Sequence, residues 1–241
     1  MRFFRDLANV APPSVRYKIG ASVVKNQATR WVSGGAGSVT DPASVTSCPD
    51  FAGVTLEAAT YSTTQSDSEG TVHIIDSPTA LFLCRVVPSA TKDTAFADTD
   101  GYLLTNTSAD SGGTTVTDSD ISTTGAAMVD GELFCLTGNN VGQSRIITAH
   151  TVSTTVMVVT VPFDNTIAVG DSFLATPYGP GVIAVKLTTD FTQADATDAG
   201  GTGAEFVVKQ MILETKHKGA TKAAPLLYAV IASTDHYLNK A

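Results

Sequence analysis

The sequence contains few residues of the kinds that form disulfides and metal centres. Its three cysteines, Cys48, Cys84 and Cys135, are widely spaced, form no Cys-x-x-Cys pair and have no histidine at zinc spacing. We therefore expect no disulfide framework, no metal site and no cofactor. Cys84 and Cys135 lie in apolar segments, which predicts that they are small buried hydrophobic residues.

Long apolar segments are also absent. No run approaches the roughly 18 residues that a transmembrane helix needs, so we expect no membrane partner. Near the N-terminus, arginines flank the Phe3-Phe4 pair at once, which removes the apolar region that a signal peptide requires. These features predict a protein that is made in the cytoplasm of a cell and stays there or leaves by lysis.

Charged residues are scarce, at 16%, and they are unevenly distributed. Residues 1–30 carry a net charge of +5, residues 31–208 carry −16 and residues 209–241 carry +3, which gives −8 for the chain. This asymmetry favours a protein whose ends face a negatively charged partner while its centre faces solvent. Pairing of the basic ends with the acidic middle of the same fold explains it equally well.

What the sequence does contain is a pattern of short β-strands, clearest between residues 130 and 178. Apolar runs rich in β-branched or aromatic residues alternate with Gly, Asn, Thr and Ser, which is typical of antiparallel strands joined by tight turns. The expected strands are Glu132–Leu136, Ser144–Ala149, Thr155–Val161 and Ser172–Thr176. Residues 156–159 are continuously apolar, which predicts burial on both faces and a contact with a second copy of the chain through Met157 and Val158.

The same pattern extends over the rest of the chain. Further strands are expected at Tyr17–Lys25, Arg30–Ser33, Gly53–Ala58, Gly70–Ile75, Leu81–Val87, Tyr102–Leu104, Thr114–Val116, Val182–Leu187, Glu205–Leu213 and Leu226–Ala232, the last of which also fits a short helix. We therefore predict an all-β protein of two small antiparallel β-barrel or sandwich domains with a short N-terminal arm. The expected units are the arm at 1–14, the first domain at 15–95, the second domain at 96–181, and C-terminal strands at 182–241 that close the fold or contact a partner.

The arm combines apolar and basic residues. Phe3, Phe4 and Leu7 have helical spacing with arginines among them, and Pro12-Pro13 ends any helix. A segment of one turn is not stable alone, so we expect it to dock on its own domain or on a neighbouring protein.

Two motifs have a catalytic or metal-binding interpretation that their context does not support. Residues 170–174, GDSFL, match the serine block of GDSL hydrolases, but no Asp-x-x-His block follows, and a turn before a strand explains them. Asp98-x-Asp100-Gly101 begins like a calcium loop, but its glycine comes too early and no glutamate ends the run.

Two further groups of residues carry weaker signals. Asp195 and Asp198, beside two glycines, form a possible weak surface cation site. The histidines have no acid or thiol at a spacing that indicates catalysis, so each is expected to be an ordinary surface or core residue; they are His73, His150, His217 and His236. No catalytic residue is therefore expected.

Two stretches resemble structural proteins of tailed bacteriophages. Residues 142–150, GQSRIITAH, followed by an alternating Thr/Val strand, Pro162-Phe163 and Gly170-Asp171-Ser172-Phe173, look like a β module of virion proteins. Gly53–Ala59 together with Glu69–Val72 is similar to the small barrels of phage head decoration, or cement, proteins. Together these similarities cover residues 15–180.

The resemblance implies a non-enzymatic protein on the outside of an icosahedral head, often a trimer, that clamps neighbouring subunits of the major capsid protein without binding nucleic acid. In that setting the arm residues Arg2, Phe3, Phe4, Arg5 and Leu7 are expected to contact the capsid. A tail, neck or baseplate component is the first alternative. A carbohydrate-binding β protein is the second, although a single Trp and 7% aromatic residues give it little support.

Overall fold

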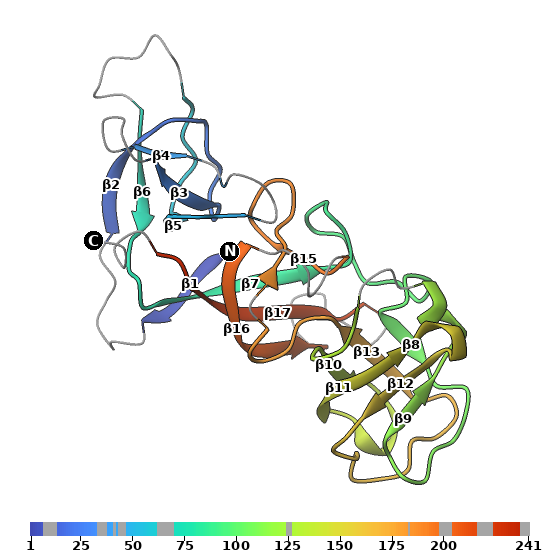
Figure 1. Cartoon of the computed structure of the whole chain (residues 1–241). Helices are drawn as coiled ribbons and strands as arrows, with labels where there is room; N and C mark the ends of the chain where they lie inside the picture. The colour runs from blue at the N-terminus through green and yellow to red at the C-terminus, as the bar shows by residue number, and fades with distance from the viewer. Residues whose placement is uncertain are drawn as a thin grey trace.

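The protein consists of three β-sheets that follow one another along an elongated molecule (Figure 1). The computed structural model describes residues 1–6, 14–32, 38–40, 42, 47–61, 70–123, 127–182, 184–197, 204–215 and 224–236. A closed barrel lies at one end, a six-stranded sheet lies in the middle, and a second six-stranded sheet lies at the other end.

The N-terminal barrel is closed in the strand order β2-β4-β3-β5-β6. Its strands are β2 (Ser14–Ile19), β3 (Ala28–Val32), β4 (Ser38–Thr40), β5 (Phe51–Thr55) and β6 (Thr71–Ile75). Alternate residues point inward, as in β6, where Val72 and Ile74 are fully buried and Thr71 and His73 are not. The small interior is filled by Ile19, Val23, Val39, Ala52, Val72 and Ile74.

The central sheet has the order β1-β7-β17-β16-β14, and β15 also pairs with β7. Its strands are β1 (Arg2–Asp6), β7 (Ala80–Val87), β14 (Ala184–Val185), β15 (Ala194–Asp195), β16 (Ala204–Glu214) and β17 (Leu226–Ser233). Strand β7 is covered on both faces: Phe82 and Cys84 belong to the main core, whereas Leu81 and Leu83 pack with Val230 in a smaller cluster. This explains why residues 80–87 form a nearly continuous apolar run.

The distal sheet has the order β8-β13-β10-β11-β12-β9. Its strands are β8 (Leu103–Thr105), β9 (Thr115–Thr117), β10 (Glu132–Cys135), β11 (Ser144–Thr151), β12 (Val156–Val159) and β13 (Ser172–Thr176). Short 3₁₀ helices lie between strands: η1 (Ser119–Thr123), η2 (Gly138–Asn140) and η3 (Val152–Thr154). The backbone N–H of Thr107 donates to the carbonyl of Thr117 at 2.8 Å, so the chain just after β8 approaches the end of β9 and the sheet is nearly closed.

Aromatic residues join the barrel to the central sheet. The ring of Phe51, in β5, packs edge-on against Phe82 and Phe206, with centroids 5.7 and 5.1 Å apart. On the other side, the hydroxyl of Tyr178 donates to the carbonyl of Asp195 in β15 at 2.6 Å. One apolar core therefore runs from Phe51 through the central sheet to the distal strands.

The architecture confirms the predicted all-β class with two small barrel-like units. Within the described residues, each strand predicted above overlaps an observed one. Of the described part of residues 182–187, only Ala184–Val185 are a strand, and Leu226–Ala232 is a strand and not a helix. The helical interpretation of the arm was wrong, because Arg2–Asp6 form an edge strand that pairs with β7. A segment this short fits both periods, and pairing with a sheet edge satisfies its backbone where a single helical turn would not.

The expected two-sided burial of β12 is also corrected. Met157 and Val159 are buried in the chain's own core, whereas Val156 and Val158 are only half-buried. Met157 is therefore not available to a second copy of the chain, and of the two expected contact residues only Val158 is accessible.

Candidate functional site

The clearest candidate for an interaction site is a cavity with basic walls on the central sheet, which we call the basic pocket. Its volume is about 270 Å³. Its walls come from β1, β7, β17, the turn at residues 25–26 and the two loops at residues 92–93 and 192–193, and they comprise Met1, Arg2, Lys25, Asn26, Leu83, Arg85, Lys92, Asp93, Thr192, Gln193 and Tyr228. Four of these side chains are basic and one is acidic.

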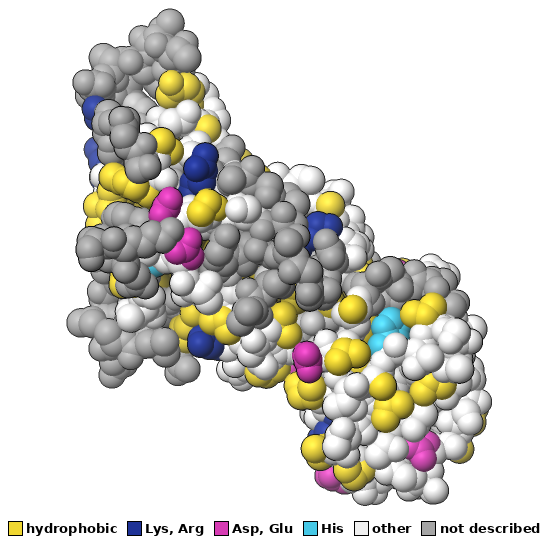
Figure 2. Space-filling model, in the orientation of Figure 1, with side chains coloured by type: hydrophobic (Ala, Val, Ile, Leu, Met, Phe, Trp, Pro, Cys, Tyr) yellow, Lys and Arg dark blue, Asp and Glu magenta, His cyan; other side chains and the backbone are white. Residues whose placement is uncertain are grey.

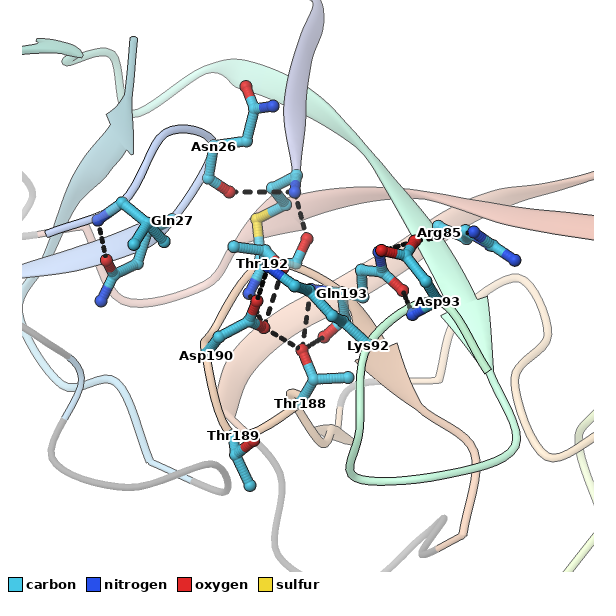
Figure 3. A network of polar contacts seen from close by, with 12 residues as sticks. Asn26, Gln27, Arg85, Lys92, Asp93, Thr188, Thr189, Asp190, Thr192 and Gln193 are labelled. Atoms are coloured by element: carbon cyan, nitrogen blue, oxygen red, sulfur yellow. Dashed lines mark hydrogen bonds and ion pairs between the residues drawn. The ribbon is translucent and has the colours of Figure 1, made fainter. Parts of the chain in front are cut away.

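Two of the four basic side chains are held in ion pairs. Nη1 of Arg85 lies 2.8 Å from Oδ1 of Asp93, and Nζ of Lys92 lies 3.1 Å from Oδ2 of Asp190 (Figure 3). Arg2 and Lys25 are exposed and make no ion pair within the part of the chain that the structure describes. Among the described residues, two cations of the pocket therefore have no carboxylate partner.

The loop that carries Asp190 holds Lys92, one of the residues that line the pocket, in position. Oδ1 of Asp190 accepts hydrogen bonds from the hydroxyls of Thr188 and Thr192, each at 2.8 Å, and from the N–H of Thr192 (Figure 3). Burial by itself would raise the pKa of Asp190, but these hydrogen bonds and the Lys92 ammonium outweigh it and lower the pKa below its usual value. Asp190 is thus a charged anchor for Lys92.

Met1 is also part of the pocket lining. The amino group of Met1 donates to the carbonyl oxygens of Asn26, at 2.9 Å, and Thr192 (Figure 3). Its side chain is buried in the main core, and burial lowers the pKa of the amino group. Residues from three distant parts of the chain therefore meet at one point.

A second cavity lies on the outer side of the distal sheet, with a volume of about 320 Å³. It is lined by Glu132, Ser144, Arg145, Ile146, Thr148, Thr160 and Val161. Oε1 of Glu132 accepts a hydrogen bond from the Ser144 hydroxyl at 2.5 Å, whereas Oε2 is buried without a partner. Burial raises the pKa of Glu132, and the bond from Ser144 offsets only part of that effect.

The structure places the expected capsid-contact residues unequally. Arg2 lines the basic pocket. Phe3, Phe4 and Arg5 also belong to β1, but the structure describes only their backbone. Leu7 lies outside the described residues. Sequence reasoning missed Arg85, although a lone arginine in the apolar run 81–87 is a detectable signal; nothing in the sequence links Lys92 to Asp190 across almost a hundred residues.

The serine-hydrolase interpretation of residues 170–174 has no support in the geometry. Asp171 is buried and Oδ2 accepts the N–H of Ala168 at 2.9 Å, while its carboxylate lies so close to Gly138 that any Cβ there would meet Oδ1 at 2.0 Å. His236 is bound instead to the barrel, with Nε2 3.3 Å from Oδ1 of Asp76. The motif is a structural turn before β13.

The loop of Asp195, which carries a weak cation signal in the sequence, and the turn of Asp98 and Asp100, which only begins like a calcium loop, both have structural roles. Asp195 is fully buried, pairs with Lys186 at 3.3 Å and accepts the N–H of Thr197, so it is not a surface cation ligand; Asp198 lies outside the described residues. Asp100 accepts the N–H groups of Ala97 and Tyr102 within its own turn. Among the described residues, no group of His, Cys, Asp or Glu is arranged to hold a metal ion.

The cysteines and histidines follow the sequence expectations where the structure describes them. All three cysteines are buried, and none of them forms a disulfide. His73 is a surface residue whose Nδ1 lies 3.0 Å from Oε1 of Glu57, and His236 is a core residue; His217 lies outside the described residues.

Comparisons of the chain with protein-family models, with curated proteins and with solved structures each return no significant match. Among the described residues, no helix has the length and apolar character needed to cross a membrane.

Proposed function

We propose that this chain is a structural protein of a tailed bacteriophage that decorates the outside of the head and stabilises it by bridging neighbouring subunits of the major capsid protein. The observation that carries the proposal is the arrangement of a β module at each end of one continuous core. Such an elongated body can contact two capsid subunits at once, and the strand pairing within each sheet, together with the core that joins the sheets, resists deformation under the outward pressure of packed DNA.

The resembling segments support this proposal by their positions. Gly53–Ala59 begins in β5 of the barrel, and residues 142–150 lead into and include most of β11 of the distal sheet. Each of the two modules therefore contains one of the patterns that resemble virion proteins. On the face that Figure 2 shows, the distal module carries scattered hydrophobic side chains and few charged ones. A neutral surface of this kind suits close packing against another protein.

A trimer is part of the same proposal. The half-buried outer face of β12, which carries Val156 and Val158, is the surface on which we expect a second copy to pack. Three copies around a symmetry axis of the head would cover this face in each copy and would present three basic pockets to the capsid.

Localisation of the protein on particles tests the proposal. Particles of the virus that encodes the chain would be purified and its presence established by mass spectrometry, after which cryo-electron microscopy would locate its density. We expect density on the outside of the head across seams between capsid subunits. Density confined to the tail, neck or baseplate would replace the decoration role with that of a tail component, and absence of the chain from particles would reject both.

A further inference from the structure

The basic pocket has a charge that contrasts with the rest of the protein. The chain carries a net charge of −8, yet four basic side chains converge on this cavity of about 270 Å³. Of the carboxylates that the structure describes, Asp93 and Asp190 face them, and each is already bound to a basic partner. Arg2 and Lys25 stay unpaired within the described chain, so the cavity attracts an anion.

Two of the basic side chains of the pocket are also held in place by hydrogen bonds between its walls. Gln193 and Asp93 bind each other twice, which fixes the loop that carries Lys92. Asp93 in turn holds Arg85, whose guanidinium has further N–H groups to donate. Leu83 and Tyr228 form part of the walls, so a bound anion is partly removed from water and its attraction to the cations is strengthened.

We propose that the basic pocket binds a carboxylate side chain from an acidic segment of the partner protein, with Arg2 and Lys25 as its direct contacts and Arg85 as the third donor. This inference rests on the proposed function, in which the partner is the major capsid protein. The cavity has room for about nine water molecules at ~30 Å³ each, which suits one side chain and a few waters and not a whole secondary-structure element.

The charge of the surroundings favours an acidic peptide over a nucleic acid. Residues 31–208 carry −16, so an extended polyanion that leaves the pocket meets a repulsive surface. Nucleic-acid binding usually needs a row of cations along the backbone path, whereas this site is a single cavity. A protein segment needs to place only one carboxylate in it.

Binding of a labelled hexaglutamate peptide to the full chain tests the assignment. Fluorescence anisotropy would be measured at about 50 mM NaCl, where screening is weak, with a hexaglutamine peptide as the uncharged probe. Arg2→Gln and Lys25→Gln are the test variants. Lys209→Gln is the matched control, because Lys209 is an exposed lysine of β16 that lies outside the pocket and makes no ion pair with the residues that the structure describes. Inorganic phosphate and a single-stranded DNA oligonucleotide are the competing anions.

We expect saturable binding of hexaglutamate and none of hexaglutamine. Each test variant should weaken the affinity by about tenfold, the loss of one charge-assisted hydrogen bond, and the control should leave it unchanged. Raising the salt to about 0.3 M should weaken binding further. Equal weakening by Lys209→Gln, or no binding of hexaglutamate, overturns the assignment to this pocket, and tighter binding of the oligonucleotide overturns the choice of ligand.

The outcome is separable from that of the proposed function. If the protein is located on the head and Arg2→Gln and Lys25→Gln still decorate particles with full occupancy, the pocket is not the capsid contact although the decoration role stands. If the pocket binds hexaglutamate but the protein lies in the tail, the acidic-peptide site stands and the decoration role fails.

Discussion

The side chain of Gln193 and the backbone and carboxylate of Asp93 form a reciprocal pair across a hundred residues of sequence. The N–H of Asp93 donates to Oε1 of Gln193 at 2.9 Å, and Nε2 of Gln193 donates to Oδ1 of Asp93 at 2.8 Å. Asp93 has a positive φ of 61°, a conformation in which an aspartate needs local support. The pair therefore fixes the loop after β7 against the loop before β15.

Replacement of Gln193 by Ala is expected to weaken the contact between these two loops. Both hydrogen bonds are lost, and because they are exposed we expect a decrease of about 1 kcal/mol in the free energy of unfolding. Urea denaturation checks the value, with Gln210→Ala, an exposed glutamine of β16, as the control. Equal effects of the two substitutions would show that the hydrogen bonds between Gln193 and Asp93 make no specific contribution to stability.

Asp110 is expected to stabilise the distal sheet in a pH-dependent manner. Its carboxylate accepts the N–H groups of Gly112, Thr114 and Thr115 at 2.9, 2.7 and 2.8 Å. Burial would raise the pKa of Asp110, but these donors outweigh it and lower the pKa. Ionised Asp110 therefore stabilises the folded state. This contribution to the free energy of unfolding is present above the unfolded pKa of about 3.9 and is lost as the pH falls through the lower folded pKa.

Asp110→Ala should therefore reduce stability at pH 7, by about 1–2 kcal/mol for a partly exposed carboxylate with three donors. The difference from the wild type should shrink below pH of about 4, as followed by thermal unfolding across the acid range. Asp110→Asn should be intermediate because the amide oxygen still accepts. A difference that does not change with pH would contradict the role of the charge.

Glu132 is expected to behave in the opposite way. Its pKa is raised by burial, so its ionised form destabilises the folded state; this cost is present above the folded pKa and absent below the unfolded pKa of about 4.3. We predict that Glu132→Gln stabilises the protein near pH 7 and is neutral in acid. Glu214→Gln removes the same charge elsewhere in the described chain and is the control. A destabilised Glu132→Gln variant at pH 7 would show that the carboxylate is needed.

Met157 and Val158 are expected to respond differently to aspartate. Met157→Asp places a charge in the core and should cost several kcal/mol, which unfolds the distal sheet as seen by circular dichroism. Val158→Asp lies on the half-buried face and should leave a single chain folded. If the protein is a trimer through this face, Val158→Asp dissociates it in light scattering. A wild-type monomer at micromolar concentration and on the head alike would refute the trimer.

Removal of residues 1–13 is expected to damage the fold itself. The lost strand β1 pairs Arg2 with Leu83 and Phe3 with Phe82, and Met1 is part of the main core. The exposed edge of β7 would then be open to pairing with other chains, so we expect aggregation and a loss of several kcal/mol in stability. A truncated protein that stays monomeric, with an unchanged urea midpoint, would show that the fold does not need this segment and would favour the interpretation of the arm as a segment that docks on a neighbouring protein.

Local patterns in the sequence were enough to predict the all-β class and most of the strands. Alternation of apolar and polar residues places Val72 and Ile74 inside the barrel, and the β-branched runs with Gly and Asn turns give the distal hairpins. These signals are local, because side-chain direction has a period of two in any strand and a tight turn needs only two to four residues. The burial of Cys84 and Cys135 followed from the same local context.

Which strands pair with one another, and where charged side chains gather, depends on contacts between remote parts of the chain. Nothing within residues 1–7 distinguishes one helical turn from a strand, and the free edge of β7 made the choice. The continuous apolar run in β12 predicts burial on both faces, but valine also favours strands with a half-exposed face. The sequence therefore could not show that one face of β12 is only half-buried. Arg2, Lys25, Arg85 and Lys92 form one pocket because chain folding brings remote loops together, and such non-local contacts leave no periodic signal in the sequence.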